Sequence, residues 1–241
     1  MTQWLEMVRR VAATDPSEVP GALRERAALT IADTVGVVRA GHREPEMRGL
    51  VTPRAAAELS PAVVGGALVL DGTGRRTTAA SAAFLNATAG SFLEQDEGIR
   101  PTGHPAMQVI PAALAAGEIA GSTNDAVIAA IVVGYEVTAR LFRAFALTHP
   151  RHPHGHLGAV GAAVAVARLY DVDATEAASI AATSPLATSW NACLEGATAR
   201  NTWMGQAAAS GVTAALLAEA GFRGSHTSLS DVFGDPSSTE P

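Results

Sequence analysis

Alanine- and glycine-rich segments with helical periodicity are the feature of this sequence that most constrains its fold. Residues 124–145 are apolar nearly all round a helix, which indicates a long buried helix. Residues 21–40 carry one apolar face, formed by Leu23, Ala27, Ile31, Val35 and Val38. Aromatic residues make up only 5% of the chain, and the apolar 48% is mostly Ala, Val and Leu. Small side chains let helices pack closely, so the sequence predicts a mainly α fold rather than a β-sandwich.

The same periodicity marks further helices along the chain. They are expected over residues 3–13, 78–93, 107–121, 157–170 and 199–220, and another should start at the capped segment 173–176. Residues 44–60 suggest a helix that Pro53 interrupts, and residues 62–74 fit either a short strand pair or irregular chain. No internal repeat or long linker is visible. We therefore expect one all-helical domain over residues 1–225, followed by a polar tail over residues 226–241.

Composition and charge argue against several classes of protein. The 241-residue chain has a formal net charge of −6 and no run of Lys or Arg, which argues against a nucleic-acid partner. Its single cysteine, Cys193, excludes an internal disulfide and a multi-cysteine zinc site, and we expect it to be buried. The N-terminus lacks the apolar core of a signal peptide, and residues 126–134 are too short to span a bilayer. We expect a cytoplasmic protein with no membrane partner.

Two polar loops between predicted helices could carry chemistry. The first, residues 94–105, holds Glu94, Asp96, Glu97, Arg100 and His104. A carboxylate next to an imidazole suits proton transfer, because histidine titrates near neutral pH and the carboxylate can raise its pKa and orient its ring. The alternative is a solvated acidic turn at a helix end, and composition alone favours that alternative.

The second loop, residues 148–158, contains four of the seven histidines: His149, His152, His154 and His156. Alternating histidines could bind a metal ion, but Pro153 and Gly155 disfavour the regular strand that would place them on one face. One or two of them could instead line an anion-binding pocket at the start of the helix near Gly158, where free N–H groups favour a carboxylate or phosphate. A basic surface loop is the third option.

Six stretches carry a resemblance to a known family. They are IADTVGVVRAG (31–41), AAFLNATAGSFLEQDEG (82–98), GHPAMQVIPAALAAGE (103–118), IVVGYEVTARL (131–141), HPHGHLGAVGAAVAVARLYDVD (152–173) and EGATARNTWMGQAAASGVTAALLAEAGFRG (195–224). Together they cover most of the chain, and their order resembles the helical half of MmgE/PrpD proteins. That family includes 2-methylcitrate dehydratase, cis-aconitate decarboxylase and iminodisuccinate epimerase.

The resemblance implies an activity and partners. Such enzymes move a proton at a carbon α to a carboxylate of a small polycarboxylate, and then expel water or CO₂ or return the proton on the other face. It implies no metal or organic cofactor, and a homodimer formed through the helical domain. The family also has an α+β lid domain, which this sequence does not include, so we expect a heteromer with a separately encoded lid subunit. The alternative is a non-catalytic binding or scaffold subunit, and a histidine-loop metal protein ranks last.

Residue by residue, the acidic loop matches the family pattern Asp-x-Asp-Asp-Thr followed by His-Pro. His104 matches the active-site histidine, and the resemblance makes it the leading acid–base candidate. Asp96 keeps a carboxylate that would orient His104 or exchange protons itself. Glu94 replaces the first Asp conservatively and is a third catalytic candidate, whereas Gly98 replaces the Thr and removes its hydroxyl.

The remaining candidates would bind substrate. The family's second histidine falls on His152, and His154 would share its pocket, while His149 and His156 are expected to be ordinary loop and helix-start residues. Arg200 stands where many members have a lysine, so it would clamp a carboxylate but not shuttle a proton. Trp203 replaces a histidine, which indicates a different substrate shape or lost chemistry. We also assign Arg100 to substrate binding.

Overall fold

The fold is mainly α, as predicted from the sequence. A computed structural model of the chain describes residues 2–100, 103–145, 147, 149–155, 157–186 and 188–234. In chain order its helices are α1 (Gln3–Ala12), α2 (Gly21–Gly41), α3 (Pro45–Gly49), α4 (Pro53–Leu59), α5 (Ala79–Ser91), α6 (Pro105–Ala120), α7 (Asn124–Ala144), α8 (Gly158–Tyr170), α9 (Ala174–Thr183), α10 (Trp190–Leu194), α11 (Thr202–Glu219) and α12 (Ser228–Phe233). Short 3-10 helices cover Pro16–Glu18 and Thr198–Asn201.

Helices α8 and α11 form the centre of the molecule. Every residue of α8 from Gly158 to Ala167 is buried, and α8 contacts α6, α7, α9 and α11. Helix α11 in turn contacts α5, α6, α8 and α9. Helix α8 is therefore more completely buried than α7, which the sequence predicted to be a buried helix. Helix α7 keeps an outer face that carries the Glu136–Arg140 ion pair.

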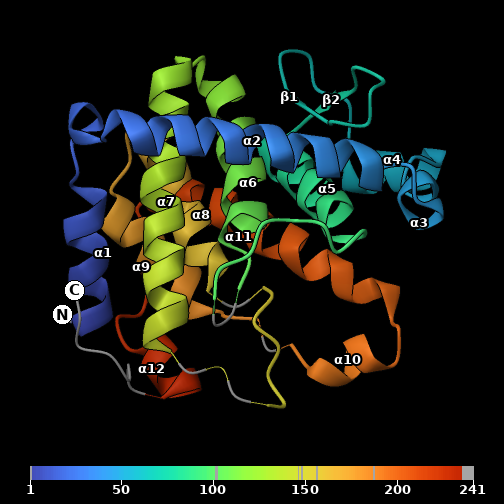
Figure 1. The fold of residues 1–241 in the computed structure, drawn as a ribbon. Coiled ribbons are helices and arrows are strands. Elements are labelled where there is room, and N and C mark those ends of the chain that lie inside the picture. Colours follow the sequence, from blue (N-terminus) through green and yellow to red (C-terminus); the bar gives the residue numbers. More distant parts are fainter. Residues whose placement is uncertain are drawn as a thin grey trace.

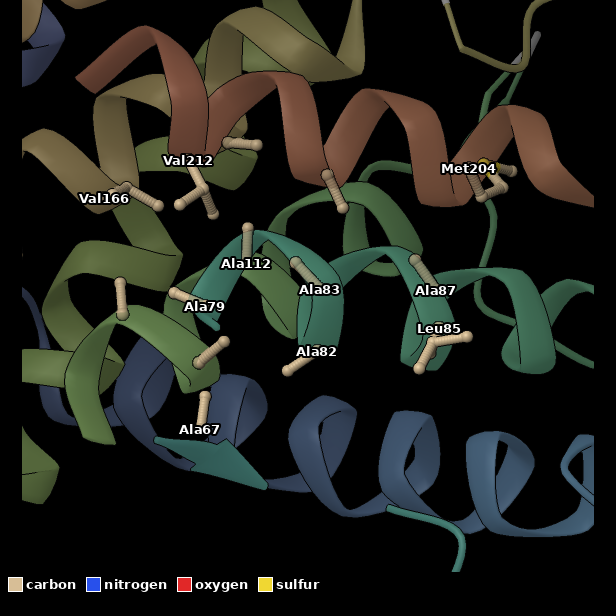
Figure 2. Close-up of a cluster of buried hydrophobic side chains, with 14 of the residues drawn as sticks. Ala67, Ala79, Ala82, Ala83, Leu85, Ala87, Ala112, Val166, Met204 and Val212 are labelled. Carbon is tan, nitrogen blue, oxygen red and sulfur yellow. The ribbon is translucent and has the colours of Figure 1, made fainter. Parts of the chain in front are cut away.

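Helix α2 lies across α5, α6 and α7 (Figure 1). Figure 2 shows α5 between α2 and α11, with its alanine side chains filling the space between the helices. Ala82, Ala83 and Ala87 are completely buried there. Because these side chains are short, the helices approach closely and bury apolar surface without large aromatic residues.

The crossing of α7 and α8 depends on two glycines. A Cβ atom on Gly161 would lie 2.3 Å from the carbonyl oxygen of Gly134, and one on Gly134 would lie 2.5 Å from the carbonyl oxygen of Gly161. The two backbones therefore touch where a side chain on either helix would keep them apart. This contact fixes the start of α8 next to the middle of α7, and so positions the loop that joins them.

The ambiguous segment after α4 forms a short hairpin. Its strands β1 (Ala67–Leu68) and β2 (Arg76–Thr77) pair antiparallel. The buried Asn86 of α5 holds the hairpin, because its Oδ1 accepts the N–H of Leu70 at 2.9 Å and its Nδ2 donates to the carbonyl of Leu68 at 3.1 Å. The same Oδ1 contacts Nε2 of His42 at 3.1 Å. Burial lowers the pKa of His42, although the contact with Asn86 acts to raise it.

The structure differs from the sequence prediction in two segments that contain short helices. The segment around Pro53 divides into α3 and α4, and each begins with a proline in its first turn, where the missing N–H has no cost. Helix α12 lies in the segment for which we expected a polar tail, and its Leu229 and Phe233 are buried against the core. The packed domain therefore extends to residue 234 rather than 225, and residues 235–241 lie outside the described part of the chain.

Within the described residues, no helix combines the length and apolar character needed to cross a bilayer.

Candidate functional site

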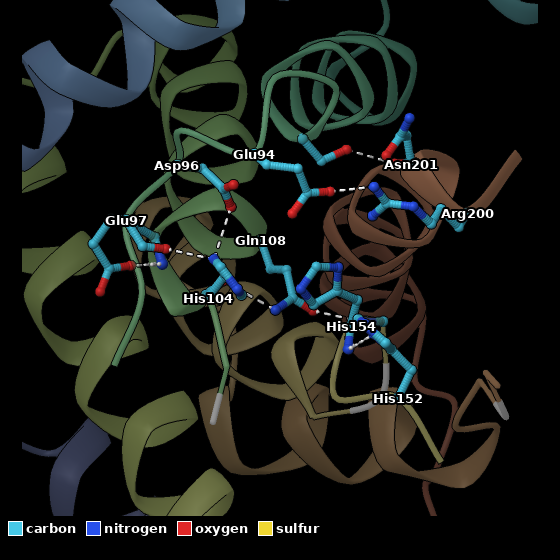
Figure 3. Close-up of polar contacts among 12 residues, drawn as sticks. Glu94, Asp96, Glu97, His104, Gln108, His152, His154, Arg200 and Asn201 are labelled. Atoms are coloured by element: carbon cyan, nitrogen blue, oxygen red, sulfur yellow. Dashed lines mark hydrogen bonds and ion pairs between the residues drawn. The ribbon is translucent and has the colours of Figure 1, made fainter. Parts of the chain in front are cut away.

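Two loops meet at one end of the bundle. The first connects α5 to α6, and its last residue, His104, directly precedes α6. The second connects α7 to α8 and carries His152 and His154. Figure 3 shows the side chains of both loops pointing toward one another, with Arg200 approaching from the 3-10 helix that precedes α11. The structure thus brings together residues that the sequence places far apart.

One ring nitrogen of His104 faces two acceptors. Nδ1 lies 2.8 Å from the backbone carbonyl oxygen of Glu97 and 3.0 Å from Oδ2 of Asp96. A carbonyl oxygen can only accept a hydrogen bond, so Nδ1 carries the proton in the neutral ring. Nε2 of His104 is then the nitrogen with a free lone pair, and no described residue hydrogen-bonds to it. This is the atom able to take a proton from a ligand.

The carboxylate of Asp96 changes the acidity of His104. Burial of the imidazole acts to lower its pKa, but Asp96 and the carbonyl of Glu97 more than offset that effect, so the pKa of His104 is raised above its ordinary value. The Asp96 side chain is only 2% exposed, whereas that of His104 is 28% exposed. Oδ2 of Asp96 also receives no well-aligned hydrogen bond from the described residues. A buried carboxylate this close to the ring favours the protonated imidazole.

His154 links the two loops through its ring. The ring centroids of His104 and His154 lie 4.6 Å apart, at an interplanar angle of 84°. The ring of His152 also meets that of His154 edge to face, with a centroid distance of 4.2 Å and an interplanar angle of 88°. Both residues are nearly buried, at 4% exposed for His152 and 5% for His154. Of the three imidazoles, that of His104 is thus the most accessible to a ligand.

Two tryptophans enclose His152. The ring of Trp190 lies 4.2 Å from that of His152, and the ring of Trp203 lies 5.4 Å from it. Trp203, which we assigned to substrate binding, also backs the histidine loop at Gly155. A Cβ atom on Gly155, whose φ is +88°, would lie 3.2 Å from the Trp203 Cβ. Both tryptophans therefore fix the position of His152.

Residues 150–154 run antiparallel to residues 188–190. The N–H of His152 donates to the carbonyl of Thr188 at 3.0 Å, and the N–H of Trp190 donates to the carbonyl of Pro150 at 2.9 Å. The hydroxyl of Thr188 donates to the carbonyls of both His152 and His154, at 2.9 Å each. The histidine loop is consequently held by a second segment of chain rather than exposed as a basic surface loop.

The side chain of Gln108 joins the two loops by hydrogen bonds to the backbone of each. This completely buried residue of α6 donates through Nε2 to the carbonyl of His104 at 3.1 Å and accepts the N–H of Gly155 on Oε1 at 3.2 Å. Gln108 stands four residues after His104, which places it on the same face one helical turn further on. Such spacing is the signal in the sequence that points to the role of Gln108.

Arg200 and Glu94 form an ion pair at the edge of the site. The Arg200 side chain is 19% exposed, whereas that of Glu94 is 52% exposed. Cys193 lies beside this pair and is half-buried, not fully buried as we expected. Burial raises the pKa of the Cys193 thiol, although Arg200 acts in the opposite direction.

The other expected residues lie apart from this cluster. Arg100 is exposed, and no hydrogen bond or ion pair joins it to the residues that the structure describes. His149 is exposed as well, and His156 lies outside the described residues. Across the described ranges, no three His, Cys, Asp or Glu side chains are grouped so that they could hold a metal ion.

The sequence matches the family model of the MmgE/PrpD N-terminal domain over residues 6–234. The chain belongs to the MmgE/PrpD family. The match begins within α1 and ends just after α12, so the packed part of the chain corresponds to the family's N-terminal helical domain. A comparison with curated proteins finds no match.

Several residues at the site of this MmgE/PrpD domain were missed by sequence reasoning. They are Gln108, Tyr135, Thr188 and Trp190. Trp190 and Thr188 reach the site only because their segment pairs with the histidine loop, and no local pattern predicts that pairing. Glu97 was seen in the acidic loop, but its contact with His104 is made by the backbone, which composition cannot reveal.

Proposed function

We propose that this MmgE/PrpD domain moves a proton at a carbon α to a carboxylate of a small polycarboxylate, as a lyase or isomerase. In dehydration and epimerisation Nε2 of His104 removes the α proton. In dehydration, the electron pair left on carbon expels the β-hydroxyl group, which takes up a proton and leaves as water. In epimerisation, the carbanion takes up a proton from water on the opposite face. In decarboxylation no α proton is removed: the carboxylate leaves as CO₂, its bonding pair stays on the substrate carbon, and the protonated ring of His104 supplies the proton to the substrate. The proposed reaction uses no metal or organic cofactor.

The observation that carries this proposal is the buried carboxylate of Asp96 next to Nδ1 of His104. With Asp96 Oδ2 at 3.0 Å, the imidazolium formed after proton transfer is stabilised by a nearby negative charge. Nε2 of His104 has no hydrogen-bond partner among the described residues. The His104 side chain is also more exposed than that of Asp96, so a ligand can reach Nε2. A solvated acidic turn, the alternative from composition, does not account for a carboxylate that is only 2% exposed.

Substrate binding is assigned to the residues around His104. Arg200 offers a planar guanidinium that can hold a carboxylate with two hydrogen bonds. Its present partner, Glu94, is half-exposed and can be displaced by a substrate carboxylate or can take part in proton exchange. His152 and His154 form the polar wall opposite Asp96, and Trp203 limits the space behind them. The exposed Arg100 would reach substrate only if its loop closes over the site.

The site is expected to act in an assembly. The His104 side chain is 28% exposed and Glu94 is 52% exposed, so a covering element would exclude water and strengthen the electrostatic contacts of the site. We propose that a lid of the kind found in the family supplies this cover, as a separate subunit or a further domain. Self-association through the helical domain remains our expectation for this chain.

Exchange of substrate protons with solvent tests the proposed reaction. The purified protein, alone and with any co-purifying partner, is incubated with small di- and tricarboxylates in D₂O, and loss of the α-proton signal is followed by NMR. We expect His104→Ala to lower the exchange rate by about 10²- to 10⁴-fold with the helical circular dichroism intact. His149→Ala is the control, because His149 is exposed outside the cluster. Undiminished exchange in His104→Ala would exclude this function.

A non-catalytic binding subunit is the second candidate. Gly98 favours it, because a Cβ at this position would lie 3.4 Å from Cε1 of His104, where the family pattern supplies a hydroxyl-bearing side chain. The observation that separates the two candidates is saturable binding of a polycarboxylate, measured by calorimetry, without any proton exchange. Binding together with exchange supports the enzyme.

A further inference from the structure

We infer that Glu97 and Tyr135 form a positioning pair that holds His104 in its Nδ1–H form and leaves Nε2 free for proton transfer. The effect of this pair on catalysis rests on the proposed function. Its effect on the tautomer of His104 does not, because the tautomer can be measured without substrate. Tyr135 is not among the site residues expected from the sequence, and Glu97 was noted only as a member of the acidic loop, with no role assigned to it. Each contact of Glu97 contributes to this role.

The carboxylate of Glu97 has two partners on different elements. Oε1 accepts the hydroxyl of Tyr135 on α7 at 2.6 Å, and Oε2 accepts the N–H of Ala106 in the first turn of α6 at 3.1 Å. Pro105 has no N–H, so Ala106 carries the first free N–H of α6. A carboxylate is favoured there by the helix dipole. Glu97 therefore ties the loop to two helices at once.

The backbone of Glu97 contacts His104 directly. Its carbonyl oxygen accepts from Nδ1 of His104 at 2.8 Å, so the residue fixed by the side-chain contacts is also the hydrogen-bond acceptor for the ring. A backbone hydrogen bond also joins two residues of this loop, because the N–H of Ile99 donates to the carbonyl of Gly103 at 2.9 Å. Moving the Glu97 side chain would therefore move the atom that selects the tautomer of His104.

Helix α7 supplies a second support to the same loop. Phe142 stands seven residues after Tyr135, on the same face of α7. A Cβ atom on Gly103, whose φ is +111°, would lie 2.6 Å from the Phe142 ring, so the loop backbone rests directly on that ring. Tyr135 and Phe142 thus hold the two ends of the segment that surrounds His104.

The Tyr135 hydroxyl is suited to donate without losing its proton. Burial and the neighbouring Glu97 carboxylate both raise the pKa of Tyr135 far above its ordinary value. The hydroxyl therefore remains a hydrogen-bond donor to Glu97 over the whole range in which histidine titrates. Glu97 and Tyr135 line a groove of about 410 Å³ between α2, α6 and α7, so removing the hydroxyl opens no sealed cavity.

Nitrogen NMR of the ¹⁵N-histidine-labelled protein tests the inference directly, because the two ring nitrogens have different shifts in each tautomer. In the wild-type protein we expect Nδ1 of neutral His104 to carry the proton. In Tyr135→Phe and in Glu97→Ala we expect a measurable population of the Nε2–H form. If the proposed reaction occurs, kcat falls by roughly 10- to 100-fold in these variants with little change in KM, since geometry rather than binding is lost.

The conservative variant Glu97→Gln separates charge from position. Its amide oxygen can still accept from one of the two donors, so the tautomer should be kept better than in Glu97→Ala. Loss of the charge should nevertheless lower the pH at which His104 titrates, because Glu97 is one of the groups that raise its pKa, with Asp96 the stronger. Glu136→Gln and Tyr170→Phe are the matched controls and should leave the His104 signals unchanged.

Two results would overturn the inference. One is a wild-type His104 whose neutral ring carries its proton on Nε2. The other is an unchanged tautomer in a folded Glu97→Ala or Tyr135→Phe protein; Tyr135→Phe, the milder change, carries this test if Glu97→Ala does not fold. The measurement needs no substrate. A protein that exchanges no substrate protons but shows the expected tautomers would refute the proposed function and support this inference.

Discussion

His154 meets His104 edge to face, with ring centroids 4.6 Å apart, although the two residues stand on loops that join different pairs of helices. This contact exists because α6 and α7 both pack against α8, so the loops at their ends converge. Gln108 completes the junction by bonding to the backbone of both loops. The site is consequently a product of helix packing, and its chemistry depends on how rigidly the two loops are joined.

Replacing Asp96 should change the pH dependence of catalysis. In the wild-type protein the raised pKa of His104 keeps the ring protonated to a higher pH than usual, so the activity of a base should rise only above that pKa. In Asp96→Asn we expect this rise to occur at lower pH, with a smaller maximum rate because the imidazolium loses its counter-charge. The measurement is kcat/KM for proton exchange across pH 5 to 9.

The control for this experiment is Asp71→Asn, which removes a carboxylate from the remote hairpin. Its profile should coincide with that of the wild-type protein. If kcat/KM rises at the same pH in Asp96→Asn as in the wild-type protein, Asp96 does not set the pKa of His104.

Replacing Gln108 should destabilise the protein by separating the loops. In Gln108→Leu the carbonyl of His104 and the N–H of Gly155 lose their partners in a completely buried position. Each of the two unsatisfied groups costs about 1–3 kcal/mol, so we expect a loss of about 2–6 kcal/mol in the free energy of unfolding. Denaturant unfolding followed by circular dichroism measures this loss.

Gln206→Leu is the matched control, because Gln206 is exposed on α11 and its side chain bonds, among the residues that the structure describes, only to the hydroxyl of Thr202. It should change the free energy of unfolding by less than about 0.5 kcal/mol. Equal stabilities of the two variants would contradict the bridging role of Gln108.

Replacing Arg200 should weaken substrate binding more than it slows the reaction. A hydrogen bond between charged groups contributes about 1.5–3 kcal/mol, so Arg200→Gln should raise KM for a polycarboxylate by roughly 10- to 100-fold with kcat nearly kept. Arg140→Gln removes a similar ion pair from α7 and should leave both constants unchanged. A fall in kcat at constant KM would instead assign Arg200 to the chemical step.

Acid should destabilise the protein through His42. Burial lowers the folded-state pKa of His42, so the neutral ring is the form that the folded protein prefers. The stability that this preference contributes is present above the unfolded pKa of about 6.5 and is lost as the pH falls through the lower folded value. In His42→Gln we expect the difference in unfolding free energy between pH 7 and pH 5 to become smaller.

His104 should act in the opposite direction, which provides an internal comparison. Its folded-state pKa is raised, so its contribution is present below about pH 6.5 and is lost as the pH rises through the raised value. His104→Gln should therefore reduce stability more at pH 5.5 than at pH 8. The same pH trend in both variants would show that one of the two assignments is wrong.

Much of the fold follows from local patterns in the sequence. Asp173 as a cap and the spacing of apolar residues mark helix starts that the structure reproduces. Helix α12 was not predicted, because its two core residues, Leu229 and Phe233, are isolated among polar neighbours in the sequence. Helix α7 was expected to be buried nearly all round, but it keeps an outer face, because the hydrophobicity of a helix does not say how many neighbours cover it.

The sequence by itself determined the helical class, the family and the identity of the candidate groups, since these depend on residue types and their spacing. Tertiary structure alone decided which of those groups meet. It placed Asp96 and the Glu97 carbonyl on one nitrogen of His104, enclosed His152 between two tryptophans and left Arg100 in solvent. The physical reason is that these contacts join segments far apart in the chain, and their distances are set by how closely small side chains let the helices pack.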